Sequence, residues 1–465
     1  MLKKLFRKKN LEQKSGEQLD RCLNAFDLTL LGIGCIIGTG IFVLTGIAAA
    51  NQAGPAVVLS FLASAFACAF AALSYAELSS SVGGCGSAYG YTYVAFGEFI
   101  AWIVGWILLM EYGMSIAAVA NGWSGYFNNA LIAMGIGFPE FLTKPPSQGG
   151  IINLPASLII LMIMTLLIIG VKESAKFNKV MVIVKVSAIL IFIALAMFNV
   201  NPENWSPFMP YGWFETLPNG KTVGVLAGAS IVFFAYVGFD AVSTAAEEAI
   251  NPQRDLPKGI INSLIFCTII YIIVAALLTG VVPYQDLNVS SPVAFALAKI
   301  GFPWASALVS TGVIAGLATV MLVLYYALTR IIFAMSRDGL LPITLSTVNK
   351  KTKTPIKTIL ICGIFISTVA GFTSLGTLAE IVNIGTLSAF VIVCLGVIFL
   401  RNKNNYEQGT FKNKWHPIVP ILGIISCSLL MIFLPIQTWI RFLIWILIGI
   451  GMYFVYSYSH SKLNQ

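Results

Sequence analysis

The chain has 465 residues, of which 58% are hydrophobic and only 10% are charged, and its mean hydropathy is +0.87. Soluble domains carry about 25% charged residues, so this composition excludes an ordinary soluble protein and indicates an outer surface that faces lipid. The formal net charge of +9 could indicate nucleic-acid binding, and the positions of the basic residues decide that question.

Apolar runs of about 20 residues, the length that spans a bilayer as a helix, occur twelve times along the chain. If the N-terminus is cytoplasmic, most lysines and arginines fall in cytoplasmic segments, as the positive-inside rule requires. The sequence therefore predicts both termini in the cytoplasm and assigns the basic charge to membrane topology, not to nucleic acid. The runs lie at about 28–50, 55–77, 98–127, 152–171, 177–199, 222–248, 259–282, 304–334, 356–373, 378–400, 417–435 and 439–458.

The N-terminal segment 1–26 is predicted to be a cytoplasmic tail. Its basic start, MLKKLFRKKN, leads into a polar stretch and not into a short apolar core with a cleavage site, so no removable signal peptide is expected. The eight cysteines form no CxxC pair and lie mostly within apolar runs. We therefore expect buried thiols and no disulfide framework.

Glycines interrupt the first apolar run, in the sequence GIGCIIGTGIF at 32–42. Backbone groups freed in hydrocarbon cost several kcal/mol each unless they line a cavity or a ligand, and paired interruptions are typical of transporter binding sites. Unwinding between Ile36 and Gly40, around Gly38, would leave the N–H groups of Thr39 and Gly40 at the start of a half-helix. Such a terminus attracts a carboxylate. The alternative is that the glycines only permit close helix packing.

The second interruption, FFAYVGFDAV at 233–242, supplies complementary chemistry. Unwinding around Gly238 would free the carbonyl groups of Phe234, Ala235 and Val237, which can accept hydrogen bonds from an ammonium group. A site with anion-binding N–H groups and cation-binding carbonyl groups fits a zwitterion, and an α-amino acid is the expected ligand. Phe234 could act as an aromatic gate over this ligand, or it could be an ordinary packing residue.

Lys185 interrupts the run at 177–199, in the sequence KVMVIVKVSAILIFIAL. A lysine at the centre of a membrane helix costs about 2.5–3.5 kcal/mol, which disfavours an unpaired position facing lipid. One interpretation is that the side chain extends to the membrane surface near Lys179. The other is that Lys185 faces the bundle interior and exchanges a proton there, which would couple transport to a proton gradient.

Acidic residues within apolar runs are functional candidates by default. Glu111 lies in the middle of the third run, where it could contact the substrate, stabilise the first broken helix or form a structural hydrogen bond. Asp240 follows the second interruption and could be a proton-carrying or gating residue. Glu247 and Glu248 lie nearer the cytoplasm and are expected to pair with basic residues of the following segment, Arg254 or Lys258.

The first five runs and the next five can be superposed, since each set begins with an interrupted helix. Because five is odd, the second set starts from the opposite side of the membrane, which is an inverted repeat suited to alternating access. The predicted fold is all-α and polytopic, with discontinuous helices 1 and 6. The predicted divisions are a tail at 1–26, repeats at 27–200 and 201–400, and a linker with helices 11 and 12 at 401–465.

An enzyme is not expected. The two histidines, His416 and His460, lie at predicted membrane edges far from the interruptions. The sequence has no metal-ligand cluster, nucleophile elbow or P-loop, so no metal, no cofactor and no catalytic residue are predicted.

Five segments resemble the amino acid–polyamine–organocation superfamily, in particular its cationic amino acid transporter branch, over nearly all of residues 20–460. The segments are IGTGIFVLTG at 37–46, YAELSSS at 75–81 with SAYGYTYVAFGE at 87–98, GFDAVSTAAEEAINPQRDLPKGI at 238–260, RIIFAMSRDGLLP at 330–342 and IGTLSAF at 384–390. The resemblance implies a leucine-transporter-like fold with two five-helix inverted repeats plus two helices, the length typical of bacterial members.

The resemblance also implies roles for individual residues. The substrate carboxylate would bind the N–H groups of Thr39 and Gly40, and its amino group would bind carbonyl groups of Ile36, Phe234, Ala235 and Val237. Lys185 would replace a sodium site and couple protons, and Phe234 would be the gate. Met321 and Glu111 would lie by the substrate side chain, although the apolar Met321 does not select a cation. The loop SSSVGGCGSAYGY lacks the basic or proline residue often found there.

The sequence thus predicts a proton-coupled amino acid importer of a bacterial cytoplasmic membrane, with an amino acid, protons and membrane lipid as its partners. An exchanger without proton coupling, or an amino acid sensor of the same fold, are the alternatives. The substrate ranking and a small membrane-protein partner stay open.

Overall fold

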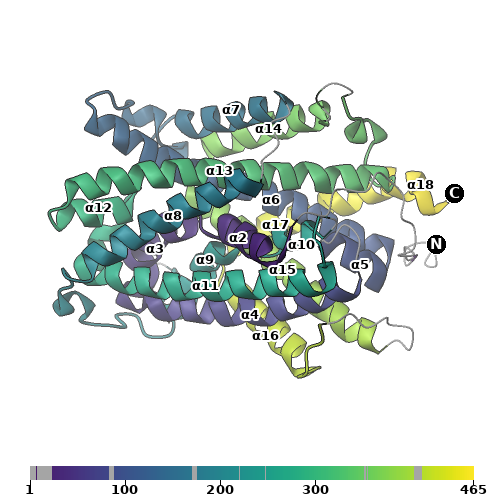
Figure 1. Ribbon diagram of the computed structural model, residues 1–465, viewed down its shortest axis with the longest axis horizontal. Helices are drawn as coiled ribbons and strands as arrows, with labels where there is room; N and C mark the ends of the chain where they lie inside the picture. Colours follow the sequence, from purple (N-terminus) through teal and green to yellow (C-terminus); the bar gives the residue numbers. More distant parts are fainter. Residues whose placement is uncertain are drawn as a thin grey trace.

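Long helices that run side by side make up most of the described structure (Figure 1). The computed structural model describes residues 7, 23–82, 88–169, 175–218, 220–246, 248–349, 352, 354–402 and 411–464. The first and last described parts of the chain meet at one end of the bundle, where the Arg7 guanidinium donates a hydrogen bond to the carbonyl group of Leu463. We call this the terminal end and the opposite one the distal end.

The helices differ widely in length, from single turns to the 36 residues of α6. The principal α-helices are α2 (Ala25–Ile36), α3 (Thr45–Ala48), α4 (Val57–Ser81), α5 (Ala88–Phe96), α6 (Glu98–Ala133), α7 (Leu154–Ile169), α8 (Ala175–Ala196), α9 (Val225–Val232), α10 (Ala241–Thr244), α11 (Pro252–Val281), α12 (Pro292–Lys299), α13 (Pro303–Arg337), α14 (Ile356–Phe372), α15 (Leu375–Arg401), α16 (Ile418–Ile432), α17 (Ile436–Met452) and α18 (Tyr458–His460). Two short antiparallel strands, β1 (Glu215–Thr216) and β2 (Thr222–Val223), pair Glu215 with Val223.

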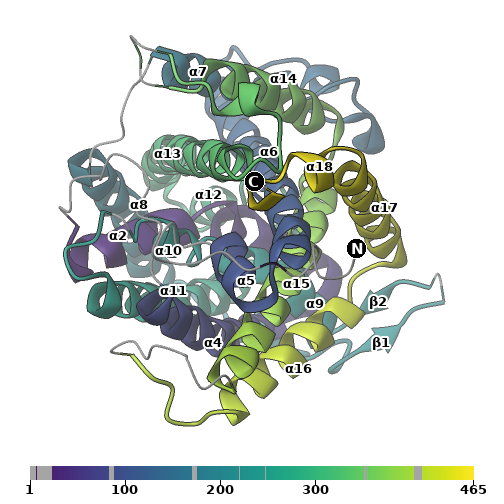
Figure 2. The same ribbon diagram turned by 90° about the vertical axis from the view of Figure 1, so that its right-hand side faces the viewer.

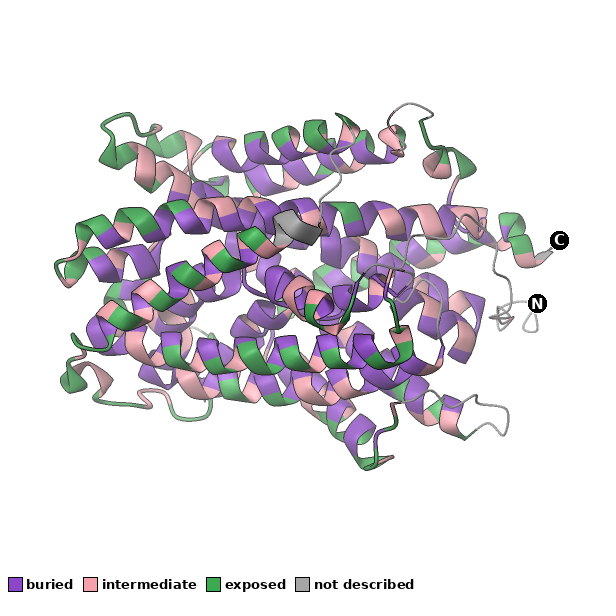
Figure 3. Ribbon diagram, viewed as in Figure 1, coloured by how far each residue is buried: buried purple, intermediate pink, exposed green. Residues whose placement is uncertain are grey.

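Eight helical stretches of the described chain have the length and apolar composition needed to cross a membrane, and four shorter apolar helices accompany them. Exposed residues lie along the outer helices (Figure 3), and many of them are large apolar residues, a pattern that suits contact with lipid. The stretches are Gly40–Ser81, Glu98–Ala133, Lys179–Ala196, Val225–Thr244, Pro252–Val281, Pro303–Arg337, Leu375–Arg401 and Ile436–His460, and the shorter helices are Ala25–Ile36, Leu154–Ile169, Ile356–Phe372 and Ile418–Ile432.

Helix α6 lies at the centre of the bundle and packs against α13 and α15, while α11 packs against α4 and α2. Figure 2, which looks along the bundle, shows α7 and α14 together at its periphery, with α16 and α17 also outside. In the apolar 18-residue stretch of α6, 89% of the residues are buried, whereas only 22% are buried in the corresponding stretch of Ile436–His460. The central helices therefore form the core, and α17 belongs to the outer surface.

The first apolar span is broken. Helix α2 starts at a capping box, in which the Asn24 side chain accepts hydrogen bonds from the N–H groups of Phe26 and Asp27, and Asp27 accepts one from the N–H of Asn24. It ends at Ile36, because Ile37 has extended backbone (φ −73°, ψ 99°). The chain becomes helical again at Gly40, where η1 (Gly40–Leu44) begins and continues into α3 and η2 (Ala49–Ala53).

The second break interrupts the span that starts with α9. Helix α9 tightens into the 3₁₀ turn η7 (Phe233–Tyr236) and ends there, because Val237 is extended (ψ 131°). Gly238 follows with φ 118°, a conformation that side-chain-bearing residues rarely adopt. Helix α10 then begins at Ala241. The structure thus contains an interruption in each of the two spans where the sequence predicts one, and Gly38 and Gly238 lie within these interruptions.

Candidate functional site

The two interruptions pack directly against each other in the interior of the bundle. A Cβ atom added to Gly40 would lie 2.3 Å from the Cα atom of Ala235, and one added to Gly238 would lie 3.1 Å from the Cβ of Cys35. Such distances leave no room for a side chain at Gly40. Glycine at this position therefore allows the backbones of the two broken spans to touch.

Backbone groups of both interruptions face the same region. Thr39 and Gly40 open η1, and the first N–H groups of a helix have no partner within that helix. The carbonyl oxygens of Ile36 and Ala235 accept hydrogen bonds from one hydroxyl, that of Tyr271 on α11, at 2.8 and 3.0 Å. Tyr271 is fully buried. Its two hydrogen bonds join the two breaks to a third helix, α11.

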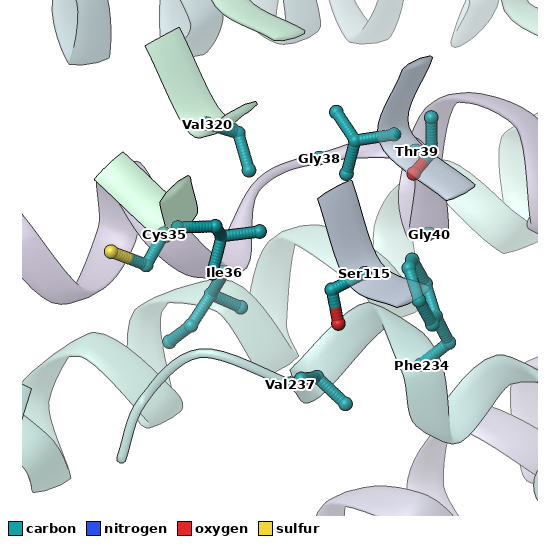
Figure 4. A pocket seen from close by; sticks show the side chains of 11 residues that line it. Cys35, Ile36, Gly38, Thr39, Gly40, Ser115, Phe234, Val237 and Val320 are labelled. Atoms are coloured by element: carbon teal, nitrogen blue, oxygen red, sulfur yellow. The ribbon is translucent and has the colours of Figure 1, made fainter. Parts of the chain in front are cut away.

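A small pocket lies between the breaks and the central helices α6 and α13 (Figure 4). The empty space in it, including the part that is open to solvent, is about 300 Å³. We call it the central pocket. Its lining residues are Cys35, Ile36, Gly38, Thr39, Gly40, Ser115, Val119, Phe234, Val237, Val320 and Leu324.

Two hydroxyl groups of the central pocket are buried without a hydrogen-bond partner within the described part of the chain, those of Thr39 and Ser115. Thr39 is fully buried and Ser115 is 2% exposed. A serine within a helix commonly donates to the carbonyl four residues before it, and a buried hydroxyl without a partner carries a cost of about 1–3 kcal/mol. Both hydroxyls are therefore available to a ligand in the pocket.

Lys185 lies beside the first break and not at the membrane surface. Its Nζ donates a hydrogen bond to the carbonyl oxygen of Gly34 in the last turn of α2, at 2.8 Å, and the residue is 1% exposed. The interpretation in which this side chain extends to the membrane surface is therefore wrong. Gly316 of α13 makes room for the lysine, since a Cβ there would lie 2.6 Å from Lys185 Cγ. A positive charge at this position complements the negative end of the α2 dipole.

Three of the predicted site residues are buried near the central pocket but do not line it. The carboxylate of Asp240 accepts a hydrogen bond from Tyr112 at 3.2 Å, and Glu111 lies on α6 one turn before Ser115. Met321 is fully buried, yet its neighbour Val320 lines the pocket instead. Successive helix residues point about 100° apart, so when Val320 faces the pocket, Met321 points away from it.

Of the other predicted residues, Ile36, Gly38, Thr39, Gly40, Phe234 and Val237 all line the central pocket. Phe234 is 6% exposed and its ring lies at one side of the pocket (Figure 4). Ala235 does not line the pocket, and its carbonyl accepts a hydrogen bond from Tyr271.

Ion pairs hold the terminal-end halves of both broken spans to neighbouring helices. Lys179 of α8 lies 2.6 Å from Asp27 of α2, and Arg330 of α13 lies 2.8 Å from Glu248, which follows α10. The expected pairing of Glu248 with Arg254 or Lys258 is wrong, because the fold brings α13 to Glu248; Glu247 lies outside the described residues. Leu23 joins the two halves through backbone hydrogen bonds with Glu248 and Ile250.

Sequence reasoning missed Tyr271 and five residues that line the pocket, Cys35, Ser115, Val119, Val320 and Leu324. The four on α6 and α13 had a detectable signal, because Ser115 and Val119, like Val320 and Leu324, are spaced i, i+4 on one helix face. Tyr271 had none, since one tyrosine in an apolar run reveals nothing about which carbonyl groups it reaches.

Comparison with known proteins gives a consistent set of relatives. Residues 23–456 match the family model described as amino acid permease. The chain is 48% identical over 467 residues to a methylthioribose transporter of Bacillus subtilis and 49% identical over 471 residues to a branched-chain amino acid permease of the same organism, with 99% of each chain covered in both cases. It is 38% identical over 388 residues to a vacuolar cationic amino acid transporter of Arabidopsis thaliana, covering 83% of this chain and 64% of that protein.

Proposed function

The chain belongs to the amino acid permease family, and we propose that it imports amino acids into a bacterial cell by proton symport. Membership makes the protein a multi-pass membrane transporter and not an enzyme. The proposed mechanism is alternating access, in which the central pocket opens in turn to the two sides of the membrane.

The observation that carries this proposal is the direct contact of the two interruptions at Gly40 and Ala235. Thr39 and Gly40, at the start of η1, and Phe234 and Val237, in the second break, line the central pocket on the two sides of this contact, which supports the proposed roles of their backbone groups. The N–H groups favour a carboxylate, and the carbonyl groups favour an ammonium. In this proposal the substrate ammonium also competes with Tyr271 for the carbonyls of Ile36 and Ala235, and Phe234 is the gate.

Lys185 is the proposed proton-coupling residue. Its contact with the Gly34 carbonyl gives the charged lysine an interaction with α2 that a neutral amine would hold less strongly. Loss of the proton would loosen α2 from α8 and allow the first half-helix to move. Glu111 and Asp240 are auxiliary in this scheme, since they lie outside the pocket lining.

The proposed topology has twelve spans, with inverted repeats at 27–200 and 201–400, a tail at 1–26, and a linker with two further helices at 401–465. Each of the twelve apolar runs overlaps a helix, and both described chain ends lie at the terminal end, which supports this count. The terminal end would face the cytoplasm, since most basic residues fall in the segments predicted on that side.

A second candidate substrate comes from the 48% identity to a methylthioribose transporter. A thiosugar has neither carboxylate nor ammonium, so the charged ends of the two breaks would have no ionic partner. For this reason an amino acid is the better supported ligand, and methylthioribose belongs in the test panel.

The experiment is uptake into liposomes that contain the purified protein, with labelled alanine, leucine, arginine or methylthioribose and an inward proton gradient switched on or off. Accumulation of an amino acid only with the gradient is the expected result. Uptake only into preloaded liposomes would establish an exchanger, and binding without uptake would establish a sensor. Accumulation of methylthioribose alone would overturn the amino acid assignment.

A further inference from the structure

The wall of the central pocket opposite the two breaks is built from two helices. Helix α6 contributes Ser115 and Val119, and α13 contributes Val320 and Leu324. Each pair is spaced i, i+4, so both members point to the same side of their helix. This wall is therefore a regular feature of the two central helices.

The wall is aliphatic except for one hydroxyl. Val119 and Val320 are 2% exposed and Leu324 is 5% exposed, and the described lining contains no aspartate, glutamate, lysine or arginine. A charged group moved here from water would lose its hydration without gaining a counter-charge. An aliphatic group would gain from the removal of apolar surface from water.

Ser115 differs from the rest of this wall. Its hydroxyl is buried and lacks a hydrogen-bond partner within the described residues, and it is directed toward Val237 and Phe234 at the second break (Figure 4). This is the side of the pocket where the polar end of an amino acid would lie. Ser115 can thus complete its hydrogen bonding with the ligand.

We propose that Val119, Val320 and Leu324 accept an uncharged aliphatic substrate side chain, and that the Ser115 hydroxyl binds the polar end of the same substrate. This rests on the proposed amino acid transport and assigns its substrate class. Glu111 lies on the same face of α6, one turn before Ser115, but outside the lining.

The test is competition against labelled leucine, measured on the full-length protein in lipid nanodiscs, with norleucine, lysine, isoleucine, phenylalanine and glutamate as competitors. Norleucine and lysine form a matched pair, since both side chains have the same unbranched four-carbon chain and lysine adds only the terminal ammonium. We expect leucine and isoleucine to compete best, and norleucine to bind at least about 100-fold more tightly than lysine.

The variants separate the two roles. Val119→Ala and Val320→Ala should each weaken leucine binding by about 10-fold or more. Both should also raise the affinity for phenylalanine relative to that for leucine. Ser115→Ala should weaken the binding of every aliphatic amino acid by a similar factor, so that the order of their affinities does not change. Val104→Ala in α6 and Val313→Ala in α13 are matched controls, because both valines are fully buried and outside the pocket lining.

Lysine binding as tight as norleucine binding, especially if lost in Glu111→Gln, would overturn the assigned substrate class. An unchanged order of competitors in both folded valine variants would also overturn it. Unchanged affinities in Ser115→Ala would remove the role of the hydroxyl. If no amino acid bound at all, the proposed function itself would fail, and that result is distinct from a wrong order of competitors.

Discussion

The Nζ atom of Lys185 lies 2.8 Å from the carbonyl oxygen of Gly34, so a lysine of α8 holds the C-terminal turn of the first half-helix. The contact connects the one buried lysine of the described bundle to an element that ends at the central pocket, since Ile36 lies two residues further on. A change in the charge of Lys185 would therefore act on α2 directly, without any contact between Lys185 and the substrate.

The substitution Lys185→Gln tests this connection. The neutral amide keeps a hydrogen-bond donor but cannot exchange a proton, so we expect loss of gradient-driven accumulation while exchange into preloaded liposomes persists. Gly316→Ala gives an independent test, because its Cβ would lie 2.6 Å from Lys185 Cγ and displace the lysine without removing its charge. Accumulation at the original level in Lys185→Gln would contradict the proton-coupling role.

The contact between Gly40 and Ala235 leads to a second prediction. In Gly40→Ala the new Cβ would lie 2.3 Å from Ala235 Cα, and overpacking of this kind costs about 1–3 kcal/mol. We expect at least 10-fold weaker substrate binding, because the two breaks must separate. Gly376→Ala is the control, since its Cβ would meet nothing within 4 Å. Equal binding by Gly40→Ala and the control would show that the close contact is dispensable.

Tyr271 provides a third prediction. Tyr271→Phe removes the hydroxyl that bonds to the carbonyls of Ile36 and Ala235, and buried groups left without a partner cost about 1–3 kcal/mol. We expect a lower thermal stability of the empty protein and a larger stabilisation by substrate, whose ammonium supplies the missing donor. Tyr325→Phe is a suitable control, because Tyr325 donates to Ile359, away from the pocket. The same response to substrate in both variants would count against this role.

The ion pair between Lys179 and Asp27 leads to a fourth prediction. It joins α2 to α8 at the terminal end with a distance of 2.6 Å, and the Lys179 and Asp27 side chains are 39% and 9% exposed. Even a fully exposed pair contributes about 0.2–1 kcal/mol. Asp27→Asn removes the ion pair and should raise the ratio of molecules open at the terminal end to molecules closed there by a factor of about 1.4–5. The measurement is alkylation of Cys35, which lines the pocket, by a thiol reagent added from the terminal side.

The matched variant is Lys179→Gln, which should raise the alkylation rate by a similar factor and leaves the capping box of Asp27 in place. A rate that does not change in either single variant would mean that this pair does not hold the terminal end closed.

Composition and local pattern alone determined the class of this protein and the positions of its two interruptions. Long apolar runs leave little alternative to membrane helices, because a bilayer offers the backbone no hydrogen bonds. Glycines at 38, 40 and 238 marked where the helices break, since their effect on backbone conformation is local. The backbone ligands assigned to Thr39, Gly40, Phe234 and Val237 follow from the same local property, and these residues do line the central pocket.

Only the tertiary structure decided which side chains surround the pocket. The choice of Val320 over Met321 depends on the rotation of α13, and the contacts of Tyr271 and Lys185 depend on how α11 and α8 lie against α2. The pairing of Glu248 with Arg330, 82 residues away, could not be read from local spacing. Helix rotation and packing result from the summed contacts of the whole bundle, and no single segment contains that information.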